Sequence, residues 1–276
     1  KRGLKDAREM IGDAAFRFSH ALARRPSPAV VNGLRAGAGP DPDFAVFSAQ
    51  HDAYRKALSD AGVAVTTLPA DNAHPDAVFV EDAALMIAGQ AIILKPGAVS
   101  RRGEAARMAE DAAGHVDGVI HLTDDGRVDG GDILVTGREA LIGLSERTDT
   151  AGANAVGAVL AALGVASRRL ATPAAVLHFK SDCGLLDGDT VFATERLAAS
   201  GCFAGYDVVT ALAGEEAAAN LVRVNDHVLL ASGFPRSAEM LDRLGYRVKL
   251  IDIGEAAKID GGLSCMSLRY TRQEAP

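Results

Sequence analysis

The chain has 276 residues, of which 48% are hydrophobic and 24% are charged, and its formal net charge is −7 at pH 7. This composition is typical of a globular protein and excludes a disordered or fibrous class. The negative net charge disfavours nucleic acid and anionic membrane surfaces as partners, because both require clustered lysine and arginine. A cationic small molecule suits this charge better.

The cysteine count and the length of the apolar runs indicate the cellular compartment of the protein. Three cysteines without close spacing, Cys183, Cys202 and Cys265, disfavour a secreted disulfide framework and indicate a reducing, cytoplasmic environment. The N-terminal run KRGLKDAREMIGDAAFRF contains basic residues but no apolar stretch, so we expect no signal peptide. Apolar runs such as AIIL are far shorter than the roughly 20 residues of a membrane helix, so we expect no membrane partner.

The N-terminal part of the chain predicts a leader, a strand, a loop and a helix. Residues 1–13 form a leader that we expect to be helical or disordered. The run Phe16–Leu22 alternates bulky with small or polar residues, which indicates a strand. Residues 23–43 are rich in proline and glycine and long for a connection, so we expect a lid loop. The sequence DPD then precedes a helix with one apolar face from Phe44 to Leu58, and the strand VAVTTLP follows.

The rest of the chain repeats a unit of hairpin, helix and strand. Hairpin turns at Gly89, Gly137, Gly188 and Asp226 each lie between two runs of β-branched and aliphatic residues. A helical stretch, a glycine and another β run follow each hairpin. The interval of roughly 40 to 50 residues is in the range of propellers and other repeat proteins.

A fifth unit requires both ends of the chain. The run Cys265–Tyr270 has strand character but no partner after it, whereas the N-terminal strand lacks a partner before it. If the two pair, the ring closes, no sheet edge is exposed, and residues 14–276 form one α/β-propeller domain. An open α/β sheet of the same elements is the alternative that spacing leaves open.

Ionisable residues stand in the first β run of several hairpins, among apolar neighbours. Such groups are costly in apolar strands unless they are paired. If the first strands line a common axis, the groups converge on one pocket, as an active site requires. They are Asp76, Glu81, Asp82, Asp129, Asp132, His178 and Lys180, together with Ser181, and Cys265 stands in the equivalent place of the fifth unit.

A cysteine and a histidine in one pocket indicate nucleophilic catalysis, since the thiolate attacks and the imidazole moves protons. Carboxylates beside a thiol raise its pKa and make it a poor nucleophile. The arrangement becomes productive if a cation lies between them. A guanidinium stays charged at pH 7 and presents a planar fork that matches carboxylates.

The segments FVEDAALM, KPGAVSRR, VDGGDILVTGREALIGLSERTD, HFKSDC and IDGGLSCMSLRY resemble the dimethylarginine dimethylaminohydrolases of the guanidino-group-modifying superfamily. The resemblance extends in order from about residue 16 to residue 270. It implies a five-bladed α/β-propeller, the pentein fold, and hydrolysis of N-omega-methylated arginine to citrulline and an amine. It also implies that no metal and no organic cofactor takes part.

Residue roles follow from the same resemblance. Cys265 is expected to be the nucleophile and His178 the general acid and base. Asp129 takes an acidic position, Asp or Glu among relatives, that orients the histidine. Carried over in the same way, the substrate contacts are Asp82 and Glu81 for the guanidinium, Arg101 and Arg147 for the α-carboxylate, and Asp76, Ile259, Asp260 and Leu34 for the α-amino group.

Several alternatives remain open from the sequence. Another guanidine hydrolase or deiminase of the superfamily would share the pocket, and so would an amino-acid-binding relative that has lost the chemistry. Free-arginine deiminases usually carry an inserted helical domain for which this chain has no room. A zinc site is disfavoured, because the closely spaced Cys and His pairs of such sites are missing. The oligomeric state is undetermined, with a homodimer as one option.

Overall fold

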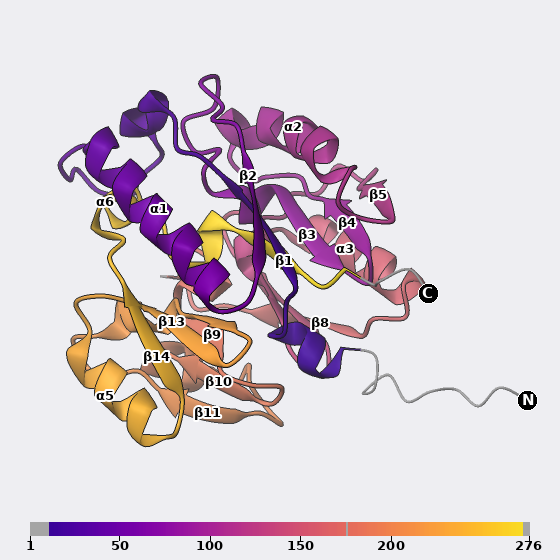
Figure 1. The fold of residues 1–276 in the computed structure, drawn as a ribbon. Helices are drawn as coiled ribbons and strands as arrows, with labels where there is room; N and C mark the ends of the chain where they lie inside the picture. The colour runs from indigo at the N-terminus through magenta and orange to yellow at the C-terminus, as the bar shows by residue number, and fades with distance from the viewer. Residues whose placement is uncertain (1–10, 175, 273–276) are drawn as a thin grey trace, which may run out of the picture.

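The computed structural model describes residues 11–174 and 176–272 (Figure 1). Every strand in these residues belongs to one of five three-stranded sheets. Each sheet has the same design: two strands pair antiparallel, as a hairpin in four of the sheets, and a third strand lies parallel to the second. The five-bladed α/β-propeller, which the family resemblance implies and the repeat agrees with, is therefore confirmed, and the open sheet is excluded.

Four blades follow one another along the chain. Their strands are β3 (Ala84–Ile87), β4 (Gln90–Ile93) and β5 (Gly118–His121); β6 (Ile133–Val135), β7 (Ala140–Leu144) and β8 (Ser167–Ala171); β9 (Cys183–Leu185), β10 (Thr190–Ala193) and β11 (Asp207–Thr210); and β12 (Val222–Val224), β13 (His227–Ala231) and β14 (Arg247–Ile251).

The fifth blade joins the two ends of the described chain. The C-terminal strand β15 (Leu268–Tyr270) pairs antiparallel with β1 (His20–Arg24), which lies parallel to β2 (Ala64–Leu68). The expected closure by both termini is confirmed. The N-terminal strand begins later than predicted, however: a short 3-10 helix, η2 (Gly12–Ala15), is followed by Phe16–Ser19, and β1 starts only at His20.

The boundary of the leader also differs from the prediction. Residues 1–10 lie outside the described residues. Ile11 is buried, and the backbone N–H of Gly12 donates to the carbonyl of Gly137 at 2.9 Å. Residues 11–13 therefore pack against the propeller instead of forming part of a separate leader.

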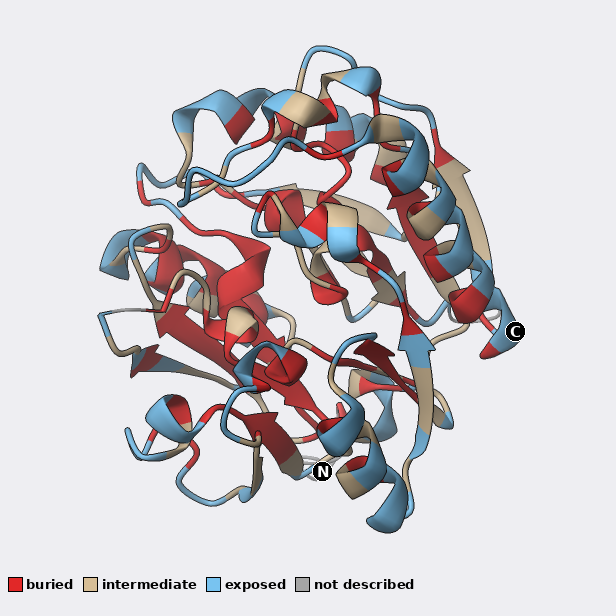
Figure 2. Cartoon of the chain, turned by 90° about the vertical axis from the view of Figure 1, so that its left-hand side faces the viewer, coloured by how far each residue is buried: buried red, intermediate tan, exposed pale blue. Residues whose placement is uncertain are grey.

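Helices connect the second and third strands of the blades and lie at the periphery (Figure 1). The predicted N-terminal helix is α1 (Phe44–Asp60), and the side chain of Asp43 accepts the backbone N–H groups of Ala45 and Val46 at its start. Buried residues gather in the strands and central turns, whereas the helices expose their outer faces (Figure 2). None of the described helices is long and apolar enough to cross a membrane. The other helices are α2 (Arg102–Ala112), α3 (Thr150–Ala162), α4 (Glu195–Ala198), α5 (Pro235–Arg243) and α6 (Gly254–Ala257).

A 3-10 turn precedes the first strand of every blade and corrects one prediction. Except for Asp76, which lies further upstream, the ionisable residues expected inside the first strands lie in or next to these turns. A strand directs its side chains to the two faces of its sheet, which are packed against apolar neighbours, whereas a turn keeps them at the end of the sheet. The turns are η4 (Val80–Ala83), η6 (Gly130–Asp132), η7 (Phe179–Ser181), η8 (Glu216–Ala219) and η9 (Ser264–Met266).

The turns contact one another around the centre of the propeller: η4 packs against both η6 and η9, and η7 packs against both η6 and η8. Beyond them, the first strands surround a cavity of about 310 Å³, which all five blades line with residues such as Met86, Leu134, Leu185, Val222 and Leu268. The fold therefore brings residues that are far apart in sequence to one end of its axis.

Candidate active site

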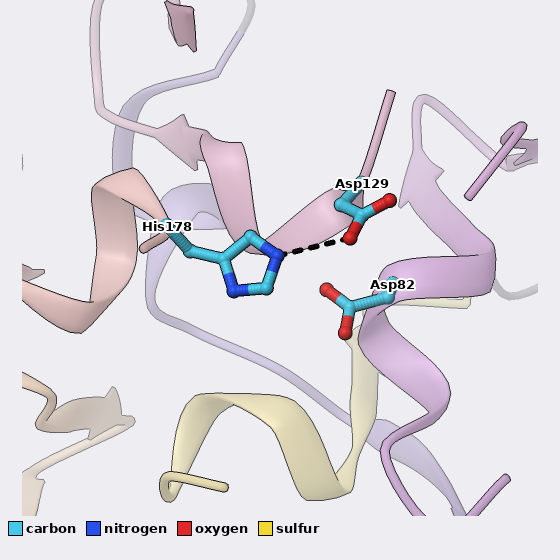
Figure 3. A group of neighbouring side chains, drawn as sticks. All are labelled: Asp82, Asp129 and His178. Atoms are coloured by element: carbon cyan, nitrogen blue, oxygen red, sulfur yellow. Dashed lines mark hydrogen bonds and ion pairs between the residues drawn. The ribbon is translucent and has the colours of Figure 1, made fainter. Parts of the chain in front are cut away.

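His178 and Asp129 occupy equivalent places, each as the N-cap residue of a central turn. Nε2 of His178 lies 2.9 Å from Oδ2 of the fully buried Asp129 (Figure 3). Burial lowers the pKa of His178, but the negative charges of Asp82, Asp129 and Asp132 outweigh it and raise the pKa to about 9. At neutral pH the imidazole is therefore protonated and can act as an acid.

Asp82 faces the same imidazole from turn η4 (Figure 3). Its Oδ1 accepts the backbone N–H of Gly131 at 2.9 Å, and its Oδ2 is paired with Arg101. Burial raises the pKa of Asp82, but Arg101 and His178 outweigh it and lower the pKa to about 2. A Cβ on Gly131 would lie 2.9 Å from Oδ1 of Asp82 and 3.0 Å from Cγ of His178, so a glycine is needed where these groups meet.

Asp82, Asp129 and His178 also raise the question of a metal, because one ligand atom from each lies within 4.8 Å of the others. The carboxylate oxygens are already engaged. Asp129 accepts from Gly97 N at 2.7 Å and pairs with His178, and both oxygens of Asp82 have partners. The cluster fits a hydrogen-bonded acid–base network better than a cation site.

Cys265 lies in turn η9 and not in the strand that the sequence predicts, which begins only at Leu268. The half-buried thiol belongs to the turn that packs against η4, where Glu81 and Asp82 lie. Burial and the charges of Asp82 and Glu81 raise the pKa of the Cys265 thiol to about 12. The cysteine is therefore protonated at neutral pH unless a positive charge offsets these carboxylates.

Glu81 is the second carboxylate expected beside the guanidinium, and the structure gives it two cationic partners. Its Oε1 lies 2.6 Å from Nζ of Lys180 and 3.0 Å from Nη2 of Arg269. Its Oε2 is buried and has no hydrogen-bond partner among the described residues. Glu81 thus keeps one acceptor atom available.

Arg101, expected at the substrate carboxylate, is buried and extensively bonded. Its Nε and Nη2 donate to Glu104, and Nη2 also donates to the carbonyls of Asp76 and Phe79 at 3.2 and 2.9 Å. Its Nη1 pairs with Asp82. The structure thus shows Arg101 holding Asp82 in place. Its contact with the α-carboxylate of a substrate remains a prediction.

Arg147 differs from Arg101. No hydrogen bond or ion pair engages its guanidinium within residues 11–174 and 176–272, and it is half-buried. Its charge lowers the pKa of Asp76, although burial dominates and raises that pKa overall. A Cβ on Gly97 would lie 2.5 Å from the carbonyl oxygen of Arg147, so the glycine lets the backbone at residue 97 approach the turn that carries Arg147. Arg147 is therefore a suitable receptor for an anionic group.

The four residues expected at the α-amino group meet at the loop before α1. Oδ1 of the buried Asp76 accepts the backbone N–H of Leu34 at 2.9 Å, and Oδ2 of Asp260 accepts that of Ala36 at 2.6 Å. A Cβ on Gly33 would lie 2.8 Å from Cδ1 of Ile259 and 3.1 Å from Oδ1 of Asp76. The structure thus brings these four residues together.

The predicted lid, residues 23–43, requires a correction at its start. Ala23 and Arg24 belong to β1, and Arg24 is buried with its guanidinium 2.6 Å from Asp111. A 3-10 helix, η3 (Pro28–Asn32), occupies part of the remainder. Movement of the segment as a lid remains a prediction.

Sequence reasoning missed three partners of the site: Glu104, Lys180 and Arg269. Lys180 stood out as a polar residue without an assigned role. Glu104 follows Arg101 by three residues, a helical spacing that brings the two side chains together. Arg269 is 188 residues from Glu81, and no local signal connects them.

Comparisons with known proteins agree with this geometry. The sequence model for "N,N dimethylarginine dimethylhydrolase, eukaryotic" matches residues 45–168. The N(G),N(G)-dimethylarginine dimethylaminohydrolase of Pseudomonas aeruginosa is 38% identical over 92% of this chain and 100% of its own length. The enzyme of the same name from Streptomyces coelicolor is 36% identical over 90% of this chain and 96% of its own.

Solved structures show the same relationship. The Pseudomonas aeruginosa enzyme, as a cysteine-to-serine variant complexed with citrulline, has a TM-score of 0.89 and 38% identity over 92% of this chain and 100% of that chain. The N-terminal domain of the cyanobacterial arginine dihydrolase ArgZ, at 16% identity and a TM-score of 0.79, shares the fold. By its identity to whole enzymes along nearly its full length, the chain belongs to the dimethylarginine dimethylaminohydrolase family.

Proposed function

We propose that this chain hydrolyses N-omega-methylated arginine to citrulline and methylamine or dimethylamine, with Cys265 as the nucleophile. One observation supports this proposal most directly: burial, followed by the charges of Asp82 and Glu81, raises the pKa of the Cys265 thiol to about 12. Such a thiol is a poor nucleophile on its own and becomes a good one when a cation binds next to it. A methylated guanidinium supplies that cation and is also the group to be attacked.

The proposed binding mode assigns each end of the substrate to one side of the pocket. Asp82, and Glu81 through its unpartnered Oε2, hold the guanidinium nitrogens. Arg147, with Arg101 behind it, binds the α-carboxylate. The α-amino group lies near the loop that Asp76 and Asp260 anchor, with Leu34 and the carbonyl of Ile259 as further contacts. This arrangement fixes the guanidinium carbon within reach of sulfur, which lowers the entropic part of the barrier.

The chemistry then requires two proton transfers by His178. The thiol releases its proton to solvent as the guanidinium binds, the thiolate adds to the guanidinium carbon, and the imidazolium gives a proton to the departing methylamine or dimethylamine as the C–N bond breaks. A covalent thiouronium on Cys265 remains. The neutral imidazole next removes a proton from water, and the resulting hydroxide adds to the same carbon. As the C–S bond breaks, the thiolate leaves, the added hydroxyl gives its proton to solvent, and citrulline is released. Asp129 holds the ring in one orientation throughout.

The first experiment tests the reaction. Purified wild type is incubated with arginine, monomethylarginine and asymmetric dimethylarginine, and citrulline and amine are quantified. We expect product from the methylated substrates and none from Cys265→Ser, whereas the matched control Cys202→Ser, a buried cysteine in another blade, stays active. Citrulline from plain arginine in preference would indicate a deiminase, and no product from any guanidine would indicate a binding protein.

The second experiment tests the role of the cation. The rate of Cys265 alkylation is measured against pH, with and without a guanidinium ligand that does not react. We expect the pKa of Cys265 to fall when the ligand binds. An unchanged pKa would refute the proposed activation, even if citrulline forms.

We also propose a cytoplasmic location, because all three cysteines are free in the structure. A reducing compartment maintains such thiols.

A further inference from the structure

Asp132 has no role in the reaction as described above, yet its carboxylate accepts hydrogen bonds from three different residues near the site. It is fully buried at the end of turn η6. Its Oδ2 accepts the hydroxyls of Ser145 and Thr148 at 2.7 and 2.6 Å, and its Oδ1 accepts the backbone N–H of Phe179 at 2.8 Å. These three donors lie on two segments, and each segment carries a residue of the proposed site.

The bond to Phe179 fixes the turn that carries the acid–base residue. Phe179 is the first residue of η7 and directly follows His178. An N–H bonded to a buried carboxylate is a strong tether, because the acceptor is charged and water is excluded. Asp132 therefore holds the backbone from which the imidazole extends toward Asp129.

The bond to Thr148 reaches Asp129 itself. The Thr148 hydroxyl donates to Asp132 and accepts the backbone N–H of Asp129 at 3.1 Å. The Thr148 hydroxyl thus connects Asp129, which binds the His178 imidazole, with Asp132, which binds the backbone of the turn next to it.

The bond to Ser145 connects Asp132 with the turn that carries Arg147, at the end of the pocket proposed to bind the α-carboxylate. The Ser145 hydroxyl donates to Asp132 and accepts the backbone N–H groups of Arg147 and Thr148 at 3.0 and 3.2 Å. This pattern closes the turn that presents the unpartnered Arg147 guanidinium. Removal of the Ser145 hydroxyl would loosen that turn without touching His178.

We propose that Asp132 is a positioning residue that ties the His178–Asp129 pair to the turn carrying Arg147, so that the group that transfers the proton and the group that binds the carboxylate keep a fixed separation. The proposal rests on the proposed function for its kinetic consequences. Asp132 also contributes negative charge beside the imidazole, along with Asp82 and Asp129.

The test compares Asp132→Asn with Asp182→Asn. Asp182 is equally buried, lies at the end of η7, and is bonded to Thr194 and Arg196, which have no part in the proposed site. We expect Asp132→Asn to lower kcat/KM by about 10²-fold, the scale of a misplacement of about 1 Å. Asp182→Asn should leave kcat/KM within about two-fold of wild type while lowering Tm, as loss of a structural ion pair does.

A second readout does not depend on turnover. The titration of the His178 imidazole is followed by NMR, with the signal assigned by its loss in His178→Asn. We expect the midpoint to move to lower pH in Asp132→Asn, because a neighbouring negative charge is removed, and to stay in place in Asp182→Asn. If the wild type makes no citrulline but the His178 midpoint still shifts in Asp132→Asn, the proposed function is refuted and the positioning role stands.

Two further variants keep the Asp132 carboxylate and each remove one of its hydroxyl partners, Ser145 or Thr148. Ser145→Ala should raise KM about 10-fold with little change in kcat, since it acts on the Arg147 turn, and Thr148→Val should lower kcat about 10-fold with little change in KM. The proposal is overturned if both variants change kcat and KM in the same proportion, or if Asp132→Asn behaves like Asp182→Asn in kinetics and titration.

Discussion

Asp129 uses both of its carboxylate oxygens: Oδ2 lies 2.9 Å from Nε2 of His178, and Oδ1 accepts the backbone N–H of Gly97 at 2.7 Å. The carboxylate therefore cannot rotate without losing two bonds at once. Nδ1, the other ring nitrogen, has no hydrogen bond among the described residues, and in Figure 3 it points away from Asp129. Asp129 thus fixes both the orientation of the ring and the nitrogen that exchanges protons.

Replacement of Asp129 by asparagine should therefore impair catalysis more than binding. The amide keeps the shape but removes the charge that favours the imidazolium, so we expect kcat to fall by about 10²–10⁴-fold, the usual contribution of acid–base catalysis. The pKa of His178 should fall as well, since Asp129 is among the groups that raise it. Steady-state citrulline formation measures the effect, and Asp129→Glu should retain most activity. Equal kcat in the asparagine variant would contradict the assignment.

Gly131 should be intolerant of even one methyl group. Its Cβ would lie 2.9 Å from Oδ1 of Asp82 and 3.0 Å from Cγ of His178, distances that real Cβ contacts do not show or rarely show. We expect Gly131→Ala to lower kcat/KM by about 10²-fold, because both side chains must move. Gly114→Ala is the matched control, since a Cβ there meets nothing within 4 Å. If both alanine variants turn over equally well, the two groups do not act at this separation.

The fold was predictable because its signals are local. Each hairpin has a glycine or an asparagine at its turn, and two of these residues adopt positive φ: Gly89 with φ of 75° and Asn225 with φ of 53°. A helix and a glycine then follow in each repeat. The closing blade could also be inferred, since a C-terminal strand without a partner and an N-terminal strand without a partner complete each other.

The central turns were not predictable from pattern. A turn of three or four residues has no periodicity, so the segment VEDA looks like the start of the strand that follows it. Assigning Cys265, His178 and Asp129 required the family resemblance, because each residue type alone is more often structural. The ion pairs could not be predicted either: Arg101 with Asp82 depends on how the turns before and after one hairpin fold, and Arg269 with Glu81 depends on how two separate blades meet.

The anchoring of the loop before α1 leads to a prediction on affinity. Asp260 has a φ of 57° and accepts the Ala36 N–H, so its backbone is left-handed and its side chain holds the loop. Asp260→Asn retains a residue type that tolerates this φ but removes the charge. We expect KM to rise roughly 10-fold, as for loss of one charge-assisted hydrogen bond, with kcat nearly unchanged. Proteolysis near residues 34–36 should accelerate in parallel. A lower kcat with normal KM would instead place Asp260 in the chemistry.

The protonated His178 should stabilise the fold at neutral pH. Its pKa is raised to about 9 in the folded state from an ordinary value of 6.5. Because the pKa is higher in the folded state, the stabilisation of the fold by the protonated imidazole is fully present below about pH 6.5 and is lost as pH rises through about 9. The free energy of unfolding should fall by about 3 kcal/mol over this range, at 1.36 kcal/mol per pKa unit. Urea unfolding from pH 6 to pH 10 measures this slope. His178→Gln should flatten it, and the exposed control His121→Gln should not.

His51 should act in the opposite direction on the acid side. It is buried in α1, and neither ring nitrogen has a hydrogen-bond partner among the residues that the structure describes; burial, followed by the charge of Arg55, lowers its pKa to about 4. Between about pH 6.5 and pH 4, His51 is therefore protonated in the unfolded chain but neutral in the folded protein. The free energy of unfolding falls by about 3 kcal/mol as pH decreases across that range. His51→Leu removes this dependence, and its unfolding free energy should vary less than that of wild type from pH 6.5 to pH 4. An unaltered acid slope would mean that His51 finds a partner or water when it is charged, and that the carboxylates alone govern acid unfolding.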